Sequence, residues 1–217
     1  MLMNLIVLGP QGSGKGTQAE LLAKKYNLEH IDIGGTLRQV AKMRTPFGEK
    51  IQKIINVEKS LVPDEILNDI LKLKINSLPR EQGIIFDGVP RTLSQAEFLD
   101  NLLLEAGRKI DKVFFVNIPE GETMKRISKR WMCEKCKSIL IMGEDIESGT
   151  DKCPGCGGNV YQREDDTPEG VKKRLAIFQK ETMPVAEYYK EKNKLVEING
   201  EQEVTDVFNE IVKNIPL

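Results

Sequence analysis

The amino-acid sequence predicts an α/β fold in which helices cover both faces of a parallel β-sheet. Three observations support this class. Short apolar runs alternate with amphipathic stretches along most of the 217 residues. A glycine-rich loop follows the first apolar run, as in P-loop proteins, and two segments of different composition interrupt the alternation. One domain with two small inserts accounts for this length.

The expected core elements follow in chain order. Strand-like apolar runs occupy residues 4–8, 83–86, 112–118 and 195–198, and residues 28–31 offer a fifth. Helices are expected over residues 16–26, 64–76, 93–106, 121–130, 167–192 and 204–214. The pattern is clearest over 64–76, because its apolar residues recur at helical spacing and form a core-facing stripe.

Residues 33–61 and 131–166 fit the alternation poorly, and we expect both to be inserts between core elements. The first contains short helical pieces around 37–43 and 47–57, with no strand between them. The second is rich in cysteine and glycine and contains short strand-like pieces.

The glycine-rich loop after the first predicted strand is the most informative motif. It reads Gly9-Pro10-Gln11-Gly12-Ser13-Gly14-Lys15-Gly16-Thr17. Glycines let the backbone turn so that successive N–H groups point at phosphate oxygens. Lys15 adds a positive charge, and the following helix directs its N-terminal dipole at the same anion. The spacing Gly-x4-Gly-Lys after a strand therefore predicts phosphate binding rather than a simple tight turn.

The residue after Lys15 departs from the common P-loop pattern. Gly16 stands where a serine or threonine hydroxyl usually contacts Mg²⁺. We therefore expect Thr17 or a water molecule to take that place.

The charge balance argues against nucleic acid or an anionic membrane as a partner. The chain has 32 Lys and Arg against 33 Asp and Glu, a formal net charge of −1. No run approaches the roughly 20 apolar residues of a membrane span. The first eight residues show no basic leader or cleavage site. We expect a cytoplasmic protein, and we assign no catalytic role to the only histidine, His30.

Four cysteines form two Cys-x2-Cys pairs in the second insert. Cys133 and Cys136 are followed, after sixteen residues, by Cys153 and Cys156. Each pair directs two thiolates at one point, and two pairs complete a tetrahedral Zn²⁺ site with no open position for water. Because no secretory signal is seen, disulfides are not expected. We predict structural zinc in a module too short for its own hydrophobic core, with redox-active or metal-free cysteines as the alternative.

A second charged segment, Phe86-Asp87-Gly88-Val89-Pro90-Arg91-Thr92, lies at the end of another predicted strand. Asp87 can organise Mg²⁺ and its waters. Arg91 emerges at the edge of the sheet where the P-loop opens, because the carboxyl ends of parallel strands share one edge. Together with the P-loop, these residues favour a phosphate site over an ordinary strand end and helix cap.

Five segments, in this order, together with the two cysteine pairs, make the chain resemble the adenylate kinase family of nucleoside monophosphate kinases over essentially its whole length. They are residues 9–18, Leu61-Val62-Pro63-Asp64, residues 87–92 with Gln95, residues 126–130, and residues 162–166 with Arg174. The cysteine pairs fall where zinc-bearing members of that family carry their lid. The resemblance implies reversible transfer of the terminal phosphoryl group of ATP to AMP, giving two ADP.

The resemblance also implies site residues. For ATP these are Gly12, Ser13, Gly14, Lys15, Gly16, Thr17, Arg126, Arg130, Gly200 and Gln202. For AMP they are Ile33, Arg38, Ser60, Leu61, Val62, Gly88, Val89, Pro90, Arg91, Gln95, Arg163 and Arg174. The implied catalytic set is Lys15, Asp87, Arg91, Arg126, Arg130, Arg163 and Arg174. Asp165 and Asp166 look like lid-hinge residues that pair with basic partners.

The family pattern divides the chain into three parts. The core would comprise residues 1–32, 62–128 and 167–217, with a monophosphate-binding insert at 33–61 and a zinc-binding lid at 129–166. Mg²⁺ would accompany ATP, and Zn²⁺ would be held by Cys133, Cys136, Cys153 and Cys156. A monomer that binds only small-molecule nucleotides is expected.

The chemistry of phosphoryl transfer agrees with this assignment. Negative charge spreads over the oxygens of the transferring group, so positive donors and alignment matter more than a general base. Several converging arginines repel one another when no anionic ligand is bound. We therefore expect an open empty state and a closed bound state.

Three residues near the expected acceptor site depart from the family pattern. Ile33 replaces a hydroxyl residue, and Val89 stands where phenylalanine is common. Gly35 replaces an acidic helix cap, so a looser helix start is expected unless Thr36 acts as the cap. A different acceptor such as UMP or CMP, or GTP as donor, is therefore one alternative. A nucleotide-gated zinc-ribbon protein acting on nucleic acid is another, disfavoured by the neutral net charge.

Overall fold

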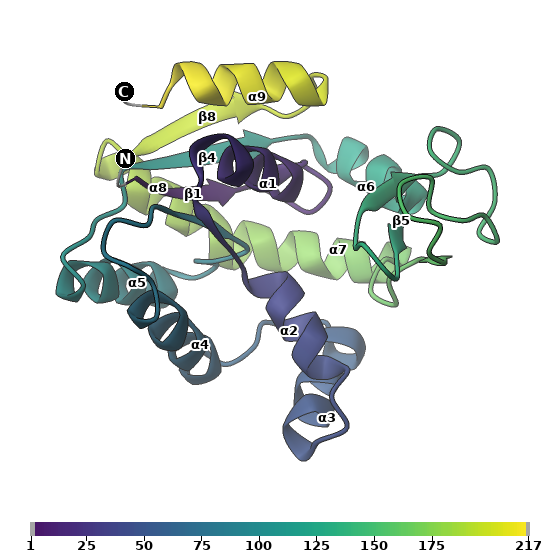
Figure 1. Cartoon of the computed structure of the whole chain (residues 1–217), viewed down its shortest axis with the longest axis horizontal. Coiled ribbons are helices and arrows are strands. Elements are labelled where there is room, and N and C mark those ends of the chain that lie inside the picture. Colours follow the sequence, from purple (N-terminus) through teal and green to yellow (C-terminus); the bar gives the residue numbers. More distant parts are fainter. Residues whose placement is uncertain (1–2, 216–217) are drawn as a thin grey trace.

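The computed structural model describes residues 3–215, which are built around a five-stranded parallel sheet (Figure 1). Its strands are β1 (Asn4–Leu8), β2 (Glu29–Asp32), β3 (Ile84–Asp87), β4 (Lys112–Asn117) and β8 (Leu195–Asn199). They lie in the order β2-β3-β1-β4-β8, and every neighbouring pair is parallel. The register places Asp32 beside Asp87 at the carboxyl edge. The predicted α/β class and all five predicted strands are confirmed.

Alternate residues of each strand pack against helices on opposite faces of the sheet. Ile6 and Leu8 of β1 belong to a core shared with the helices of one face. Leu5 and Val7 belong to a second core with the helices of the other face. Burial on both faces explains why these strands read as continuous apolar runs. The first face carries α4 (Asp64–Asn76), α5 (Leu93–Glu105) and α8 (Met183–Glu191), and the second carries α1 (Lys15–Tyr26) and α9 (Val204–Lys213).

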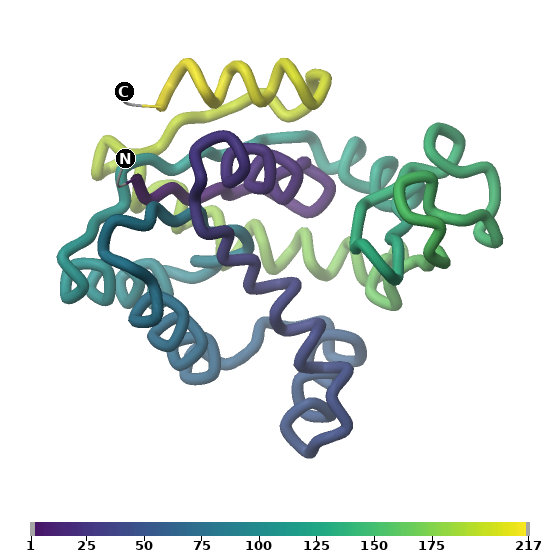
Figure 2. The backbone as a smooth tube through the Cα atoms, in the orientation of Figure 1, coloured from purple at the N-terminus to yellow at the C-terminus, as the bar shows by residue number. Residues whose placement is uncertain are grey.

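The single α-helix predicted over residues 167–192 is divided into three pieces. They are α7 (Pro168–Ile177), the π-helical segment η2 (Phe178–Thr182) and α8. Pro184 lies in the first turn of α8. A proline cannot donate a backbone hydrogen bond, and its ring crowds the carbonyl four residues earlier. The regular α-helical ladder is therefore interrupted just before Pro184, while the chain continues along one helical path (Figure 2).

The first insert consists of α2 (Ile33–Ala41), α3 (Pro46–Gln52) and the π-helical segment η1 (Lys53–Glu58). It projects away from the sheet, as the backbone trace shows (Figure 2). Helix α2 begins at Ile33 because the side chain of Asp32 caps it, accepting a 2.8 Å hydrogen bond from Gly35 N. The expected looser start, with Thr36 as the replacement cap, is wrong. The Thr36 hydroxyl instead donates to the Asp32 carbonyl at 2.8 Å.

The second insert follows α6 (Glu120–Lys129) and forms a separate three-stranded antiparallel sheet (Figure 1). Its strands are β5 (Arg130–Cys133), β6 (Ile139–Ile141) and β7 (Val160–Tyr161), in the order β6-β5-β7. Contrary to expectation, it has a small core, in which Leu140, Ile146 and Val160 pack with two cysteines. No helix within residues 3–215 is both long enough and apolar enough to cross a membrane.

Candidate active site

The P-loop connects β1 to α1 at the carboxyl edge of the sheet. Gly12 and Gly14 adopt left-handed conformations, with φ of 78° and 85°, which a residue with a side chain rarely adopts. Lys15 curls over this loop, and its Nζ lies 3.1 Å from the carbonyl oxygen of Pro10. Burial lowers the pKa of Lys15 to about 8, against the opposing attraction of Asp87. Nearby arginines lower this pKa further.

The departure at Gly16 is explained by its neighbour across the loop. A Cβ atom at this position would lie 3.1 Å from a carboxylate oxygen of Asp87. That separation is tight, so glycine leaves room for Asp87 beside the P-loop. Together, Lys15 and Asp87 form a mixed-charge pair at the ends of β1 and β3. This arrangement suits an anion accompanied by a cation.

Asp87 also faces His30, the histidine to which no role was assigned. His30 Nε2 lies 3.9 Å from Asp87 Oδ2, too far for a hydrogen bond, so the pair interacts through charge. Burial favours the neutral carboxyl, but His30, Lys15 and Arg91 outweigh it and hold the pKa of Asp87 below its ordinary value. Burial likewise opposes charging of His30, but Asp87 raises its pKa.

Asp165 and Asp166 pair with arginines, as predicted. Arg163 and Arg174 lie 2.5 and 2.8 Å from Asp165 Oδ2. Asp166 contacts Arg130 at 2.6 Å and Arg174 at 2.9 Å. The charge repulsion expected among the arginines is thus partly offset by these carboxylates in the structure. Burial alone would raise the pKa of Asp165, but the arginines hold it at about 2.

Arg38 extends from α2 toward the same region. Its Nη2 lies 3.8 Å from Asp32 Oδ2, a weak ion pair beside the helix cap. Burial lowers the pKa of Arg38 to about 10, and repulsion from Arg163 contributes. Arg38, Arg91 and Arg163 therefore contribute to one positive region balanced by only a few carboxylates.

Arg91 lies in the loop between β3 and α5. Its Nε donates to the Gly88 carbonyl at 2.9 Å, and its backbone N–H donates to Gln95 Oε1 at 2.7 Å. Gln95 is buried, and its Nε2 donates to Asp64 Oδ1 at 2.7 Å. Both ends of the Gln95 amide are therefore engaged within the protein, so contact with an acceptor base requires a change of partner.

Several other residues predicted for the acceptor side lie in packed surroundings. The side chains of Ile33 and Val89 are buried in the main core, and Val62 is buried within the first insert. The peptide bond between Val89 and Pro90 is cis. Ser60 Oγ contacts Glu58 Oε2 at 3.5 Å. The assignment of these residues to AMP stays a prediction.

On the donor side, Arg126 joins the P-loop to the segment after β8. Its Nη1 donates to the carbonyls of Gly200 at 2.9 Å and Gly12 at 3.4 Å, and its Nε donates to Glu122 at 2.7 Å. The side chain of Gln202 is engaged elsewhere, donating to the Asn199 carbonyl and to Glu210. The structure thus brings Gly12, Arg126 and Gly200 together but gives Gln202 other partners.

The four cysteines converge at the end of the second insert. Their sulfur atoms all lie within 4.8 Å of one another. Cys133 and Cys156 are separated by 3.4 Å, and Cys136 and Cys153 by 3.7 Å. A tetrahedral Zn²⁺ with Zn–S bonds of about 2.3 Å requires sulfur separations of about 3.8 Å. The donor set and its spacing therefore fit zinc.

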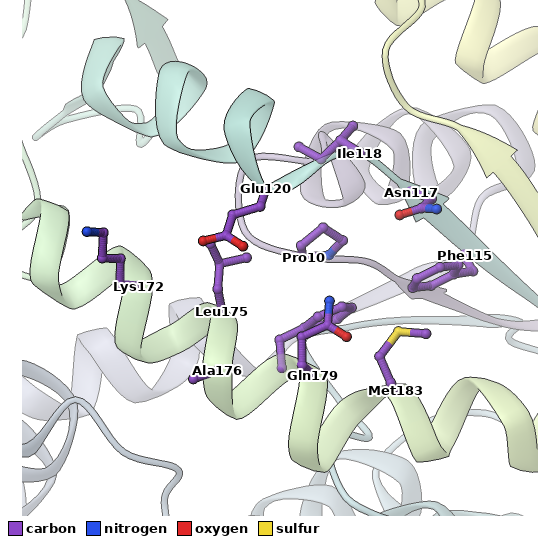
Figure 3. A pocket seen from close by; sticks show the side chains of 11 residues that line it. Pro10, Phe115, Asn117, Ile118, Glu120, Lys172, Leu175, Ala176, Gln179 and Met183 are labelled. Carbon is purple, nitrogen blue, oxygen red and sulfur yellow. The ribbon is translucent and has the colours of Figure 1, made fainter.

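A hollow of about 360 Å³ lies between α7 and the carboxyl end of β4, and Pro10 of the P-loop forms part of its lining (Figure 3). Phe115 and Ile118 contribute from one side, and Leu175 and Gln179 from the helical run. None of the predicted site residues lines it. The residues predicted to bind phosphate lie instead in the charged region at the carboxyl edge of the sheet.

Sequence reasoning missed two residues of the cleft, Asp32 and His30. Asp32 caps α2 and faces Arg38, and His30 faces Asp87. Their signal was available, since polar residues at the carboxyl end of a buried parallel strand are placed where ligands bind. The strand predicted over residues 28–31 ends before Asp32, whereas the observed β2 includes it.

Comparison with known proteins agrees with this geometry. The sequence model of the family described as adenylate kinase matches residues 7–194. The chain belongs to the adenylate kinase family. An adenylate kinase of Dehalococcoides mccartyi strain 195 is 42% identical over 215 residues, covering 99% of this chain and 98% of the relative. One of Caldicellulosiruptor bescii is 41% identical over 211 residues, covering 97% and 98%. One of Archaeoglobus fulgidus is 40% identical over 209 residues, covering 96% of each.

Membership of the adenylate kinase family confirms the resemblance drawn from the five segments and the cysteine pairs. The match spans both inserts and the strands β2, β3 and β4, and it ends just before β8. The predicted P-loop fold is confirmed with it.

Proposed function

We propose that this adenylate kinase family member transfers the terminal phosphoryl group of ATP to AMP and forms two ADP reversibly. The observation that carries the proposal is that Lys15 and Arg91 lie close enough to Asp87 to lower its pKa, and that Arg163 lowers the pKa of both cations. A transferring phosphoryl group needs positive donors on its oxygens and an aligned acceptor. The acceptor phosphate is already an anion, so no general base is required.

The donor nucleotide binds the P-loop. Backbone N–H groups of residues 12–17 surround its phosphates, Lys15 contacts the terminal ones, and Arg126 and Arg130 approach from α6 and β5. Gly200 and Gln202 border the donor base. The 2.9 Å contact between Arg126 and the Gly200 carbonyl supports a donor site at this position.

The acceptor nucleotide binds between the first insert and the sheet. Arg38 and Arg91 clamp its phosphate, joined by Arg163 and Arg174 when the site closes. The segments 60–62 and 88–90, with Ile33 and Gln95, border its base. Closure of residues 33–61 and 129–166 over the substrates excludes water, which would otherwise accept the phosphoryl group.

Two metals belong to this function. Mg²⁺ bound with ATP neutralises phosphate charge, and Asp87 with Thr17 would hold its water ligands. Zn²⁺ held by the four cysteines is structural, because a closed four-sulfur shell leaves no position for substrate. We place the enzyme in the cytoplasm as a monomer that binds only small-molecule nucleotides.

A second candidate function is the same transfer to a different acceptor. The side-chain amide oxygen and nitrogen of Gln95 both have internal partners, and Ile33 offers no side-chain hydrogen bond. Neither residue is therefore positioned to read an adenine edge without rearrangement. Recognition of another base is consistent with the same phosphate clamp.

A coupled assay of ATP-dependent phosphorylation across AMP, GMP, CMP, UMP and dTMP tests the function. Strong preference for AMP is expected. Preference for another nucleotide would leave the proposed roles of the P-loop and the arginines unchanged. It would indicate that Ile33, Gly35 and Val89 alter the acceptor specificity. Absence of transfer to all five would contradict the proposal.

Replacement of a phosphate-binding cation tests the site. Lys15→Ala and Arg91→Ala should each reduce kcat by 10²-fold or more, since each removes a charge aimed at the transferring or accepting phosphate. Circular dichroism and the melting temperature should remain close to those of the wild type. Glu20→Ala, at an exposed position of α1, serves as a control. Near-normal turnover in either variant would overturn the role of that residue.

A further inference from the structure

We propose that Thr182 is a positioning residue for Arg91, fixing the backbone from which the acceptor-phosphate clamp extends. The inference rests on the proposed role of Arg91. The Thr182 hydroxyl donates a 3.0 Å hydrogen bond to the Arg91 carbonyl oxygen. The two residues lie 91 positions apart in the sequence, so tertiary structure alone brings them together. Thr182 is 7% exposed, which shields this bond from competing water.

The backbone of Arg91 is held on both sides by side chains from different elements. Gln95 of α5 accepts from its N–H at 2.7 Å, and Thr182 donates to its carbonyl at 3.0 Å. Gln95 is fixed in turn by Asp64 of α4. The guanidinium remains accessible to solvent. Arg91 therefore combines a fixed backbone with an exposed cationic side chain whose Nε is held by the Gly88 carbonyl, an arrangement that suits a phosphate clamp.

The local helix geometry that presents Thr182 is unusual. Thr182 is the last residue of η2, the π-helical segment ahead of Pro184. A π-turn inside an α-helix is uncommon and is found frequently at functional sites. Here the turn changes the direction of the side chains that follow α7. The hydroxyl of Thr182 is thereby brought to the loop that carries Arg91.

The same helical path carries a second arginine of the cleft. Arg174 of α7 pairs with Asp165 and Asp166, eight residues before Thr182. The hinge of the second insert and the loop of Arg91 are therefore both attached to one helical path.

An isosteric pair of substitutions separates the hydroxyl from the packing of its methyl group. Thr182→Val removes the hydrogen bond while keeping the shape, and Thr182→Ser keeps the hydroxyl. We expect Thr182→Val to lower kcat about 10-fold or more and to raise KM for the acceptor, since displacements of about 1 Å can cost 10²-fold. KM for ATP should not change. Thr182→Ser should restore kcat to within about 3-fold.

Thr123→Val is the matched control. Thr123 of α6 is fully buried, and its hydroxyl has no hydrogen-bond partner among residues 3–215. Its replacement removes a buried hydroxyl without removing a contact to the cleft, so kcat and both KM values should remain at wild-type levels. Melting temperatures of all variants show which of them fold.

A double variant tests whether Thr182 acts through Arg91. In an Arg91→Ala background, Thr182→Val should cause no further loss, because the side chain being positioned is gone. Additive losses, equal impairment by serine and valine, or a normal Thr182→Val enzyme would each overturn the inference. If the wild type prefers another acceptor, the proposed function falls, and the Thr182 comparison is made with that acceptor.

Discussion

Asp32 and Gly35 form a coupled pair at the start of α2. The Asp32 carboxylate accepts from Gly35 N at 2.8 Å, and a Cβ atom at residue 35 would collide with that carboxylate. The acidic cap expected at residue 35 has therefore moved three residues earlier, and glycine leaves it room. Asp32 also lies 3.8 Å from Arg38, so the helix cap is part of the charge pattern of the cleft.

Substitution at residue 35 should reverse the usual preference of a helix for alanine. Gly→Ala in a helix ordinarily stabilises by roughly 0.5–1 kcal/mol. Here Gly35→Ala should lower the free energy of unfolding, because the added Cβ atom displaces the cap. Asp32→Ala, which removes the cap, should lower the free energy of unfolding by about 0.5–2 kcal/mol. In an Asp32→Ala background, Gly35→Ala should become stabilising. Chemical denaturation of the four proteins measures this, and a more stable single Gly35→Ala variant would contradict it.

The lowered pKa of Lys15 predicts an alkaline limit for nucleotide binding. The free enzyme keeps Lys15 protonated below pH 8 and loses the proton as pH rises through about 8. ATP affinity should be constant below that value and fall above it, with proton uptake on binding. Calorimetry in two buffers of different ionisation enthalpy measures both effects. The Lys15→Met variant should bind ATP more weakly and show no proton uptake in this pH range. An unchanged proton uptake would mean that a group other than Lys15 takes up the proton.

At the scale of elements, the second insert is held by few interactions of its own. Its core contains five buried residues, two of them cysteines, and two of its strands have three residues or fewer. A structure of this size ordinarily needs a disulfide or a metal to remain folded. The cysteine sulfurs have the separations that zinc requires.

Zinc removal should therefore destabilise the insert more than it affects the chemistry. Chelation, or Cys136→Ser, should lower the melting temperature clearly while most activity at 25 °C remains. Metal content, calorimetry and the coupled assay are measured on the same samples. Loss of activity at an unchanged melting temperature would mean that the metal is catalytic instead.

At the scale of the whole molecule, Asp165 and Asp166 join the second insert to the core. Arg130 and Arg163 come from the two ends of that insert, and Arg174 comes from α7. The first insert reaches the same junction, where Asn56 donates to Glu164 at 2.8 Å and Lys59 to Thr167 at 3.0 Å. Contacts from both inserts thus meet at one charged junction.

The Asp165 junction predicts a specific acid sensitivity. The pKa of Asp165 lies at about 2, below the ordinary 3.8. The ionised carboxylate therefore adds about 2 kcal/mol to the free energy of unfolding above pH 4, and this stabilisation is lost as pH falls toward 2. The difference in unfolding free energy between wild type and Asp165→Asn should narrow by about 1 kcal/mol from pH 6 to pH 3.

Asp206→Asn, at an exposed aspartate of α9 without an ion pair in the described part of the chain, controls for loss of a carboxylate. It should show no comparable narrowing. A constant difference for Asp165→Asn would mean that the arginines do not hold the carboxylate ionised.

Local patterns in the sequence were sufficient for the sheet, the P-loop and the cysteine site. Strands such as Asn4–Leu8 are buried on both faces, so each reads as an apolar run, and the P-loop and Cys-x2-Cys pairs depend on residues close in sequence. Family resemblance added the arginines of the cleft. The order and spacing of these arginines along the chain indicated their role in the site. From composition alone, each would be interpreted as a solvated surface charge.

Only the tertiary structure decided the contacts between distant segments. The cap at Asp32 depended on space left by Gly35, and the pairing of His30 with Asp87 depended on the register of β2 against β3. The division of the long helix before Pro184 brought Thr182 to Arg91, 91 residues away. Local sequence propensity does not predict such contacts, because the distance between two side chains on different elements is set by how those elements pack together.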